Sequence, residues 1–86
     1  MKITGTTEIK TNGITRETEK AVCVNVNVNW GEGSWKQKDI WFPKSTAEIV
    51  EVNGETHVVV ATWMMMKTRA DNAFAGHKMN FCESIN

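Results

Sequence analysis

The chain of 86 residues contains no tyrosine, one proline and two cysteines, and its ten basic residues balance ten acidic ones. This neutral balance argues against a protein that binds nucleic acid or an anionic membrane through charge alone. No apolar run is long enough to cross a bilayer, and residues 1–10 lack the apolar core of a secretory signal. We therefore expect no membrane partner, and we expect Cys23 and Cys82 to be reduced in the cytoplasm of a host cell.

Sequence motifs for catalysis, cofactor binding and metal binding are also absent. There is no Gly-x-Ser-x-Gly motif and no phosphate-binding loop, and the acidic residues form no recognisable set. His57, expected on a strand opposite Val50, and His77 share no metal-ligand spacing with each other or with the thiols. We predict no catalytic residue, no cofactor, no metal site and no enzymatic activity. A small enzyme is the least favoured of three hypotheses.

The clearest pattern is the strict alternation of residues 22–30, which read Val-Cys-Val-Asn-Val-Asn-Val-Asn-Trp. A period of two residues is typical of a β-strand with one apolar face and one polar face. The polar face carries Asn25, Asn27 and Asn29, although asparagine is a poor strand former. These amides therefore need either solvent or a hydrogen-bonding partner.

Asn-Gly pairs and a glycine-rich segment divide the chain into strands. Asn12-Gly13 and Asn53-Gly54 are typical of two-residue type I′ turns, and residues 31–34 supply a looser reversal. We predict consecutive antiparallel strands over residues 2–11, 14–30, 35–42, 46–52 and 55–62. The second strand is long enough that we expect it to bend or bulge and to take part in two sheets.

After Thr62 the apolar spacing becomes helical. Thr62 can cap a helix and Gly76 is a natural left-handed stop, so we predict a helix over residues 63–75. Its inward face is expected to carry Trp63, Met66, Ala70, Ala73 and Phe74.

Residues 79–82 alternate weakly and predict a short final strand. Residues 1–86 then form a single, mainly β (α+β) domain. Its expected architecture is a five- to six-stranded antiparallel meander with one short C-terminal helix. Whether the strands close into a small SH3-like or OB-like barrel or form a curled sheet is left open.

The pairing of the second and third strands decides which side chains face outward. With Val26 opposite Ile40 the inner face is aliphatic, whereas a shift of one residue would bury Asp39 without a partner. The outer face then combines amides with tryptophans, which can hydrogen-bond and stack on a ligand. Simple solvation of this face is the plainer interpretation. The candidate binding residues are Asn25, Asn27, Asn29, Trp35, Gln37, Asp39, Trp41 and Lys44.

Residues 39–45 read Asp-Ile-Trp-Phe-Pro-Lys-Ser and contain a Trp-x-Pro-Lys-Ser motif. This motif resembles one that follows a β-strand in small, mostly uncharacterised proteins of bacteriophages and other mobile elements. A later hydrophobic strand in those proteins ends in tryptophan, as residues 58–63 do here. The resemblance implies a small β-rich accessory protein and no catalytic activity. From the residues alone, Pro43 ends the strand or confines it to an edge, and Lys44 is a ligand contact only in the less favoured interpretation.

Three consecutive methionines follow Trp63. We expect Met66 to point inward and Met64 and Met65 to leave adaptable apolar surface beside Trp63. Filling gaps in a small core is one explanation. A partner interface formed by Trp63, Met64 and Met65, including that of a homodimer, is the other.

Two functions follow from these patterns. The first is a non-enzymatic phage or mobile-element protein that binds a host or viral protein, for example as an inhibitor of a defence or replication complex. The second is a single-stranded nucleic-acid-binding barrel that stacks bases on Trp35 and Trp41. In that case phosphates would be bound by Lys36, Lys38 and Lys44.

Overall fold

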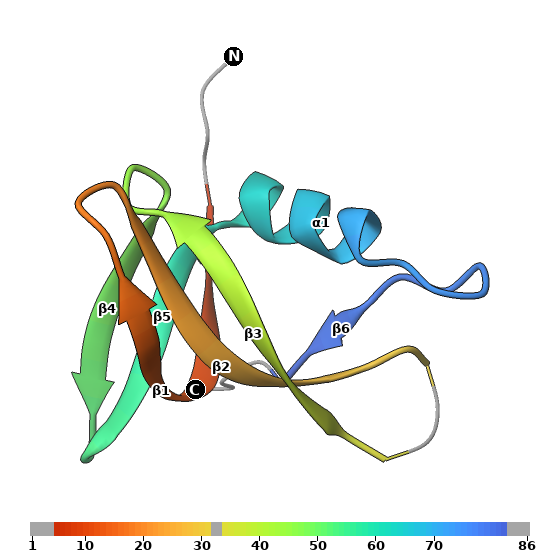
Figure 1. Cartoon of the computed structure of the whole chain (residues 1–86), viewed down its shortest axis with the longest axis horizontal. Coiled ribbons are helices and arrows are strands. Elements are labelled where there is room, and N and C mark those ends of the chain that lie inside the picture. The colour runs from red at the N-terminus through yellow and green to blue at the C-terminus, as the bar shows by residue number, and fades with distance from the viewer. Residues whose placement is uncertain (1–4, 32–33, 83–86) are drawn as a thin grey trace.

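The computed structural model describes residues 5–31 and 34–82. The described residues form β1 (Thr6–Glu17), β2 (Ala21–Asn29), β3 (Lys36–Pro43), β4 (Ala47–Val52), β5 (Glu55–Ala61), α1 (Thr62–Asp71) and β6 (Asn80–Phe81). The strands make one antiparallel sheet in the order β3-β2-β1-β5-β4, with β6 paired to β2 (Figure 1). The sheet curls without closing into a barrel. The mainly β fold with one short helix is therefore confirmed, in its curled-sheet form.

The bend that we expected in the second strand occurs in β1. Residues 6–10 of β1 pair with β5, and residues 11–17 pair with β2. Two register shifts, between Thr11 and Gly13 and between Ile14 and Arg16, mark the change of partner. A bulge bends its strand and increases its twist. One continuous strand thereby joins both parts of the curled sheet.

The hairpin turn predicted at Asn12-Gly13 is wrong. Gly13 has φ 127° and lies inside β1, where its amide donates to Oγ1 of Thr11 at 3.2 Å. An Asn-Gly pair indicates a backbone that needs positive φ, and a bulge satisfies that need as well as a turn does. The reversal between β1 and β2 comes later, between Thr18 and Ala21. The amide of Thr18 donates to the carbonyl of Ala21 at 2.8 Å, and the hydroxyl of Thr18 also bonds the backbone of Ala21.

The Asn53-Gly54 turn is confirmed. Its two residues have φ 53° and 82°, and the hairpin places His57 opposite Val50 as expected. Residues 2–4 of the first predicted strand and residues 32–33 of the predicted reversal lie outside the described residues.

β6 lies between β1 and β2 at the point where these two strands separate. The amide of Cys82 donates to the carbonyl of Asn27 at 3.1 Å, and the amide of Lys10 donates to the carbonyl of Cys82 at 3.2 Å. Phe81 lies opposite Val28. The short final strand is thus confirmed, and it pairs backbone groups that the bend of β1 would leave unpaired.

The core lies inside the curl of the sheet. Alternation along β2 is as predicted, with the valines buried and the asparagines half-buried on the outer side. The buried apolar cluster consists of Ile9, Val22, Val24, Val26, Val28, Ile40, Phe42, Val58, Val60, Met65, Met79 and Phe81.

The pairing of β2 with β3 differs from the predicted one by two residues. Ile40 lies opposite Val24, and Val26 lies opposite Lys38. A shift of two residues leaves every side chain on its original face, so the hydrophobic pattern cannot distinguish the two registers. The predicted composition of the inner and outer faces therefore holds although the register was wrong.

α1 buries a different face from the predicted one. Met65 is 6% exposed and belongs to the core, whereas Met66 is 52% exposed and Trp63 is also exposed. The helix follows β5 without a loop, so the direction in which β5 ends sets its rotation. Thr62 is therefore the first helical residue and not the cap, and its hydroxyl bonds that of Thr7 at 2.9 Å.

The helix also ends earlier than predicted, at Asp71. Gly76 has the expected left-handed backbone, φ 82°, but it forms a two-residue turn with Ala75. Phe74 and His77 flank this turn and exchange two backbone hydrogen bonds of 2.9 and 3.0 Å. None of the helices in the described part of the chain has the length and hydrophobicity needed to cross a membrane.

Candidate functional site

The outer face of β2 and β3 brings most of the predicted binding residues together. Asn25 lies directly opposite Asp39, and Asn27 lies opposite Gln37. Trp41 lies opposite Cys23, which is buried although it shares the outer side of β2 with the asparagines. We refer to Asn25, Asn27, Gln37, Asp39 and Trp41 as the amide face.

Much of the hydrogen-bonding capacity of the amide face is used within the protein. Asn12, which the sequence placed in a turn, extends from β1 and donates its side-chain amide to Oδ1 of Asn25 at 2.8 Å and of Asn27 at 3.2 Å. The amide of Asn25 donates to Oδ1 of Asp39 at 2.9 Å. Within the described residues, Gln37 keeps its full side chain available for a ligand. The row of amides is thus largely satisfied by cross-strand bonds.

Asn29 and Lys44 do not belong to the amide face, although Asn29 shares the outer side of β2. Oδ1 of Asn29 accepts from the side-chain amide of Asn80 at 3.3 Å, which connects β2 to β6. Lys44 lies beyond the end of β3, and its Nζ pairs with Oε2 of Glu17. Both side chains are therefore held by contacts within the fold.

Three of the four tryptophans are substantially exposed. Trp41 is 46% exposed on β3, Trp35 is 50% exposed just before β3, and Trp63 is exposed at the start of α1. Trp30 is half-buried, donates its indole N–H to the carbonyl of Asn72 at 2.8 Å and meets Phe74 edge-on. Trp30 therefore serves the fold, whereas Trp63, which we expected on the inward face of the helix, does not fill the core.

A groove of about 410 Å³ separates β3 from α1. β3 is an edge strand, and α1 lies on the side of the molecule away from β4 (Figure 1). Successive side chains of a strand point to opposite faces, yet four consecutive residues of β3 line this groove. The groove therefore runs along the free edge of the strand. It is lined by Lys38, Asp39, Ile40, Trp41, Pro43, Met64, Lys67, Thr68, Asp71 and Asn72.

The predicted partner interface of Trp63, Met64 and Met65 is only partly available. Met64 lines the groove, and Trp63 is exposed at the surface. Met65 is in the core and cannot contact a partner without unfolding the helix. Met66, which we expected to point inward, is exposed in its place.

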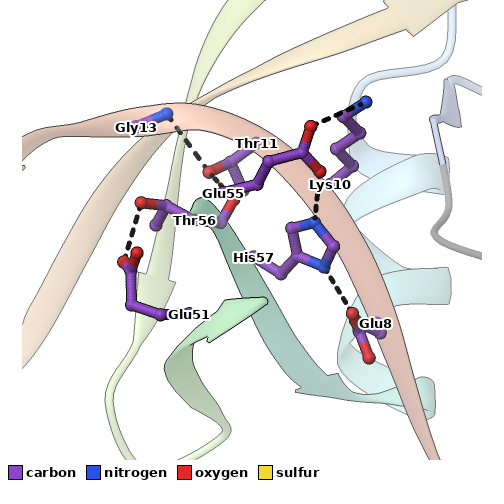
Figure 2. A network of polar contacts seen from close by, with 8 residues as sticks. All are labelled: Glu8, Lys10, Thr11, Gly13, Glu51, Glu55, Thr56 and His57. Atoms are coloured by element: carbon purple, nitrogen blue, oxygen red, sulfur yellow. Dashed lines mark hydrogen bonds and ion pairs between the residues drawn. The ribbon is translucent and has the colours of Figure 1, made fainter. Parts of the chain in front are cut away.

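A second polar cluster, which sequence reasoning missed, surrounds His57 on β5 (Figure 2). Nδ1 of His57 bonds Glu8 of β1, and Nε2 lies 3.3 Å from Oε1 of Glu55. Glu55 also pairs with Lys10 at 3.5 Å. The sequence placed Glu8 in a strand but gave no sign that this strand pairs with β5.

The electrostatics of this cluster favour a protonated imidazole. The hydrogen bond to Glu8 raises the pKa of His57, Glu55 adds to the effect, and burial opposes it. The hydrogen bond from His57, together with the charge of Lys10, lowers the pKa of Glu55. The imidazole is 4% exposed and both of its nitrogens are engaged, so neither can accept a proton from a substrate. We interpret the cluster as a cross-strand bridge between β1 and β5.

Comparison of the chain with protein-family models, with curated proteins and with solved structures finds no match. The Trp-x-Pro-Lys-Ser resemblance therefore stays a prediction.

Proposed function

We propose that this protein is a non-enzymatic binding module that engages another protein through the groove between β3 and α1. The observation that carries this proposal is the groove itself, where Trp41 of β3 and Met64 of α1 line the space beside a strand edge that has no partner in the described structure. Tryptophan and methionine are enriched in protein interfaces, and an unpaired edge offers backbone donors and acceptors.

The outer surface of α1 supports a protein partner. Trp63 and Met66 are three residues apart, so they lie on one side of the helix, and both are exposed. An amphipathic helix normally covers a core with its apolar side, whereas α1 buries only Met65 completely. Neither Trp63 nor Met66 lines the groove, so they form a separate apolar surface of α1. Apolar side chains that a small fold leaves uncovered are typical of an interaction surface.

Binding of single-stranded nucleic acid is the second candidate. The exposure of Trp35 and Trp41 on either side of Lys36 and Lys38 favours it, because indoles stack on bases and ammonium groups bind phosphates. Against it stand the cross-strand bonds of the asparagines and the ion pair of Lys44, which leave fewer groups for a ligand. We therefore rank it below protein binding.

A matched pair of tryptophan variants tests the proposal. Trp41→Ala removes a wall of the groove, whereas Trp35→Ala removes an indole of similar exposure outside it. Affinity capture from host lysate should recover a partner with wild type and with Trp35→Ala, but at least about tenfold less with Trp41→Ala. Circular dichroism would establish that both variants are folded.

Equal recovery with both variants, or recovery of nothing above background with wild type, would contradict the proposal. Titration with oligothymidine at two salt concentrations tests the nucleic-acid candidate. Quenching of tryptophan fluorescence that both substitutions weaken, and that decreases with salt, would favour nucleic acid over protein.

The origin and compartment of the protein are further parts of the proposal. The resemblance of the segment from Asp39 to Ser45 supports an accessory protein of a phage or mobile element, acting as an inhibitor of a host defence or replication complex. The unpaired thiols of Cys23 and Cys82 support the reducing cytoplasm of the host cell. Prophage genes next to the coding sequence would support this origin, and a conserved bacterial operon would argue against it.

A further inference from the structure

The backbone of β3 has three residues whose polar groups face the free edge. The amide of Lys44 donates to the carbonyl of Lys20 directly opposite, at 2.8 Å. In an antiparallel ladder hydrogen-bonded and non-hydrogen-bonded pairs alternate, so every second residue of β3 bonds β2. The intervening residues, Gln37, Asp39 and Trp41, turn their N–H and C=O groups away from β2.

The hydrogen bonds on the other edge of β2, which faces away from β3, confirm this alternation independently. The carbonyl of Asn27, which lies opposite Gln37, accepts from Cys82 on the β6 side. Pro43 marks the end of the free edge, because it has no N–H and its carbonyl already accepts from Thr46 at 2.9 Å.

The charges beside this edge favour an acidic partner. Lys36 and Lys38 lie on the inner side of β3, opposite Val28 and Val26. Within the described residues neither lysine has an acidic group at ion-pair distance. Lys67 and Asp71 across the groove neutralise each other at 2.7 Å. In the described part of the chain, the side chain of Asp39 on the same strand bonds only the neutral side-chain amide of Asn25. Two lysines against this one carboxylate leave β3 with a net positive charge.

We propose that an extended, acidic segment of the partner protein adds to β3 as a further antiparallel strand and lies in the groove beneath α1. This inference rests on the proposed function and specifies how the partner binds. Main-chain hydrogen bonds to Gln37, Asp39 and Trp41 would supply affinity, and alternate side chains would supply specificity. A second copy of β3 fits less well, because the register that uses all three residues sets Asp39 opposite Asp39 of the other copy.

The register defines a probe peptide, acetyl-Leu-Val-Thr-Glu-Thr-Glu-amide. Its first and second residues lie opposite Trp41 and Ile40, where apolar contact is available. Its third residue lies opposite Asp39, to which threonine can donate a hydrogen bond. Its two glutamates lie opposite Lys38 and Lys36. The amide of its third residue faces β3, whereas the amide of its fourth residue faces away.

Titration of the ¹⁵N-labelled protein with this peptide tests the inference. We expect the largest amide shifts at Gln37, Asp39 and Trp41. N-methylation of the third residue of the peptide should weaken binding about tenfold or more, because it removes a backbone donor. N-methylation of the fourth residue is the matched control and should change affinity less than about twofold. Replacing both glutamates by lysine should weaken binding at least about fivefold, and Lys38→Glu should partly restore it.

Three results would overturn the strand addition. They are equal affinities of the two N-methylated peptides, shifts confined to side chains outside the β3 edge, and no shift at about 1 mM peptide. If Trp41-dependent capture of a partner persists alongside any of these results, only the strand addition fails and the binding function stands. If capture fails but the peptide binds as described, the edge is competent and the proposed function is what must be abandoned.

Discussion

The rotation of α1 can be tested by a pair of methionine substitutions. Met65 is buried in the core, whereas Met66 is half exposed. Replacing a buried methionine by alanine costs about 2–5 kcal/mol, and we expect about 2–3 kcal/mol for Met65→Ala because α1 lies at the margin of the core. Met66→Ala should change the free energy of unfolding by less than about 0.5 kcal/mol. Both variants replace the same side chain in the same helix, so differences in helix propensity cancel.

The expected loss is large for a protein of this size. A free energy of unfolding of about 0.05–0.15 kcal/mol per residue gives the whole domain roughly 4–13 kcal/mol. In a domain of this length 1 kcal/mol corresponds to about 4–8 °C in the melting temperature, so Met65→Ala should melt about 10–20 °C lower. Urea titration followed by circular dichroism gives both values. A cost for Met66→Ala equal to or greater than that for Met65→Ala would refute the helix orientation and, with it, the groove.

Three further predictions concern the strands. Because the folded-state pKa of His57 is raised, its stabilising effect is complete below about pH 6.5 and is lost as the pH rises through the folded pKa. The urea midpoint of the wild type should therefore fall between pH 6 and 8.5, and His57→Gln should flatten this fall. A pH dependence of the urea midpoint that His57→Gln leaves unchanged would contradict the bridge. The opposite sign applies to Glu55, whose lowered pKa contributes stability above about pH 4.5 that is lost in acid. Glu55→Gln should therefore reduce the loss of stability between pH 5 and 3. A loss in this variant as steep as that of wild type would count against the ion pairing of Glu55. Gly13→Ala should cost about 1 kcal/mol or more, because φ 127° is strained for a residue with a Cβ; a melting temperature equal to that of wild type would argue against the bulge.

The sequence predicted the β2 pattern correctly, because alternation is a local property of a strand. Val24 and Val26 had to share a face, and Asn25 and Asn27 had to share the other. The hairpin at Asn53 could be predicted for the same reason, since its turn and both of its strands are contiguous in the sequence. The register in which two strands pair was harder to predict, because a shift of two residues leaves every side chain on the same face of the sheet.

The missed features depend on contacts between distant segments. Asn12 bonds residues 13 and 15 positions away, and Glu8 bonds a histidine 49 positions away. No local pattern indicates that β1 leaves β2 and joins β5. The rotation of α1 was missed for a related reason, since the end of β5 sets it and the apolar spacing of Trp63 and Met66 does not. The groove follows from that rotation, so it could not be predicted either.

The sharing of β1 between two neighbours has a consequence for how the protein folds. Hydrogen bonds such as that between Thr7 and Thr62 join residues 55 positions apart, so the chain must close a long loop before β5 can pair with β1. Folding should therefore be governed by this encounter of distant segments and be slow for so short a chain. No half of the sheet can persist by itself once β1 is displaced, so the domain should melt as an indivisible unit.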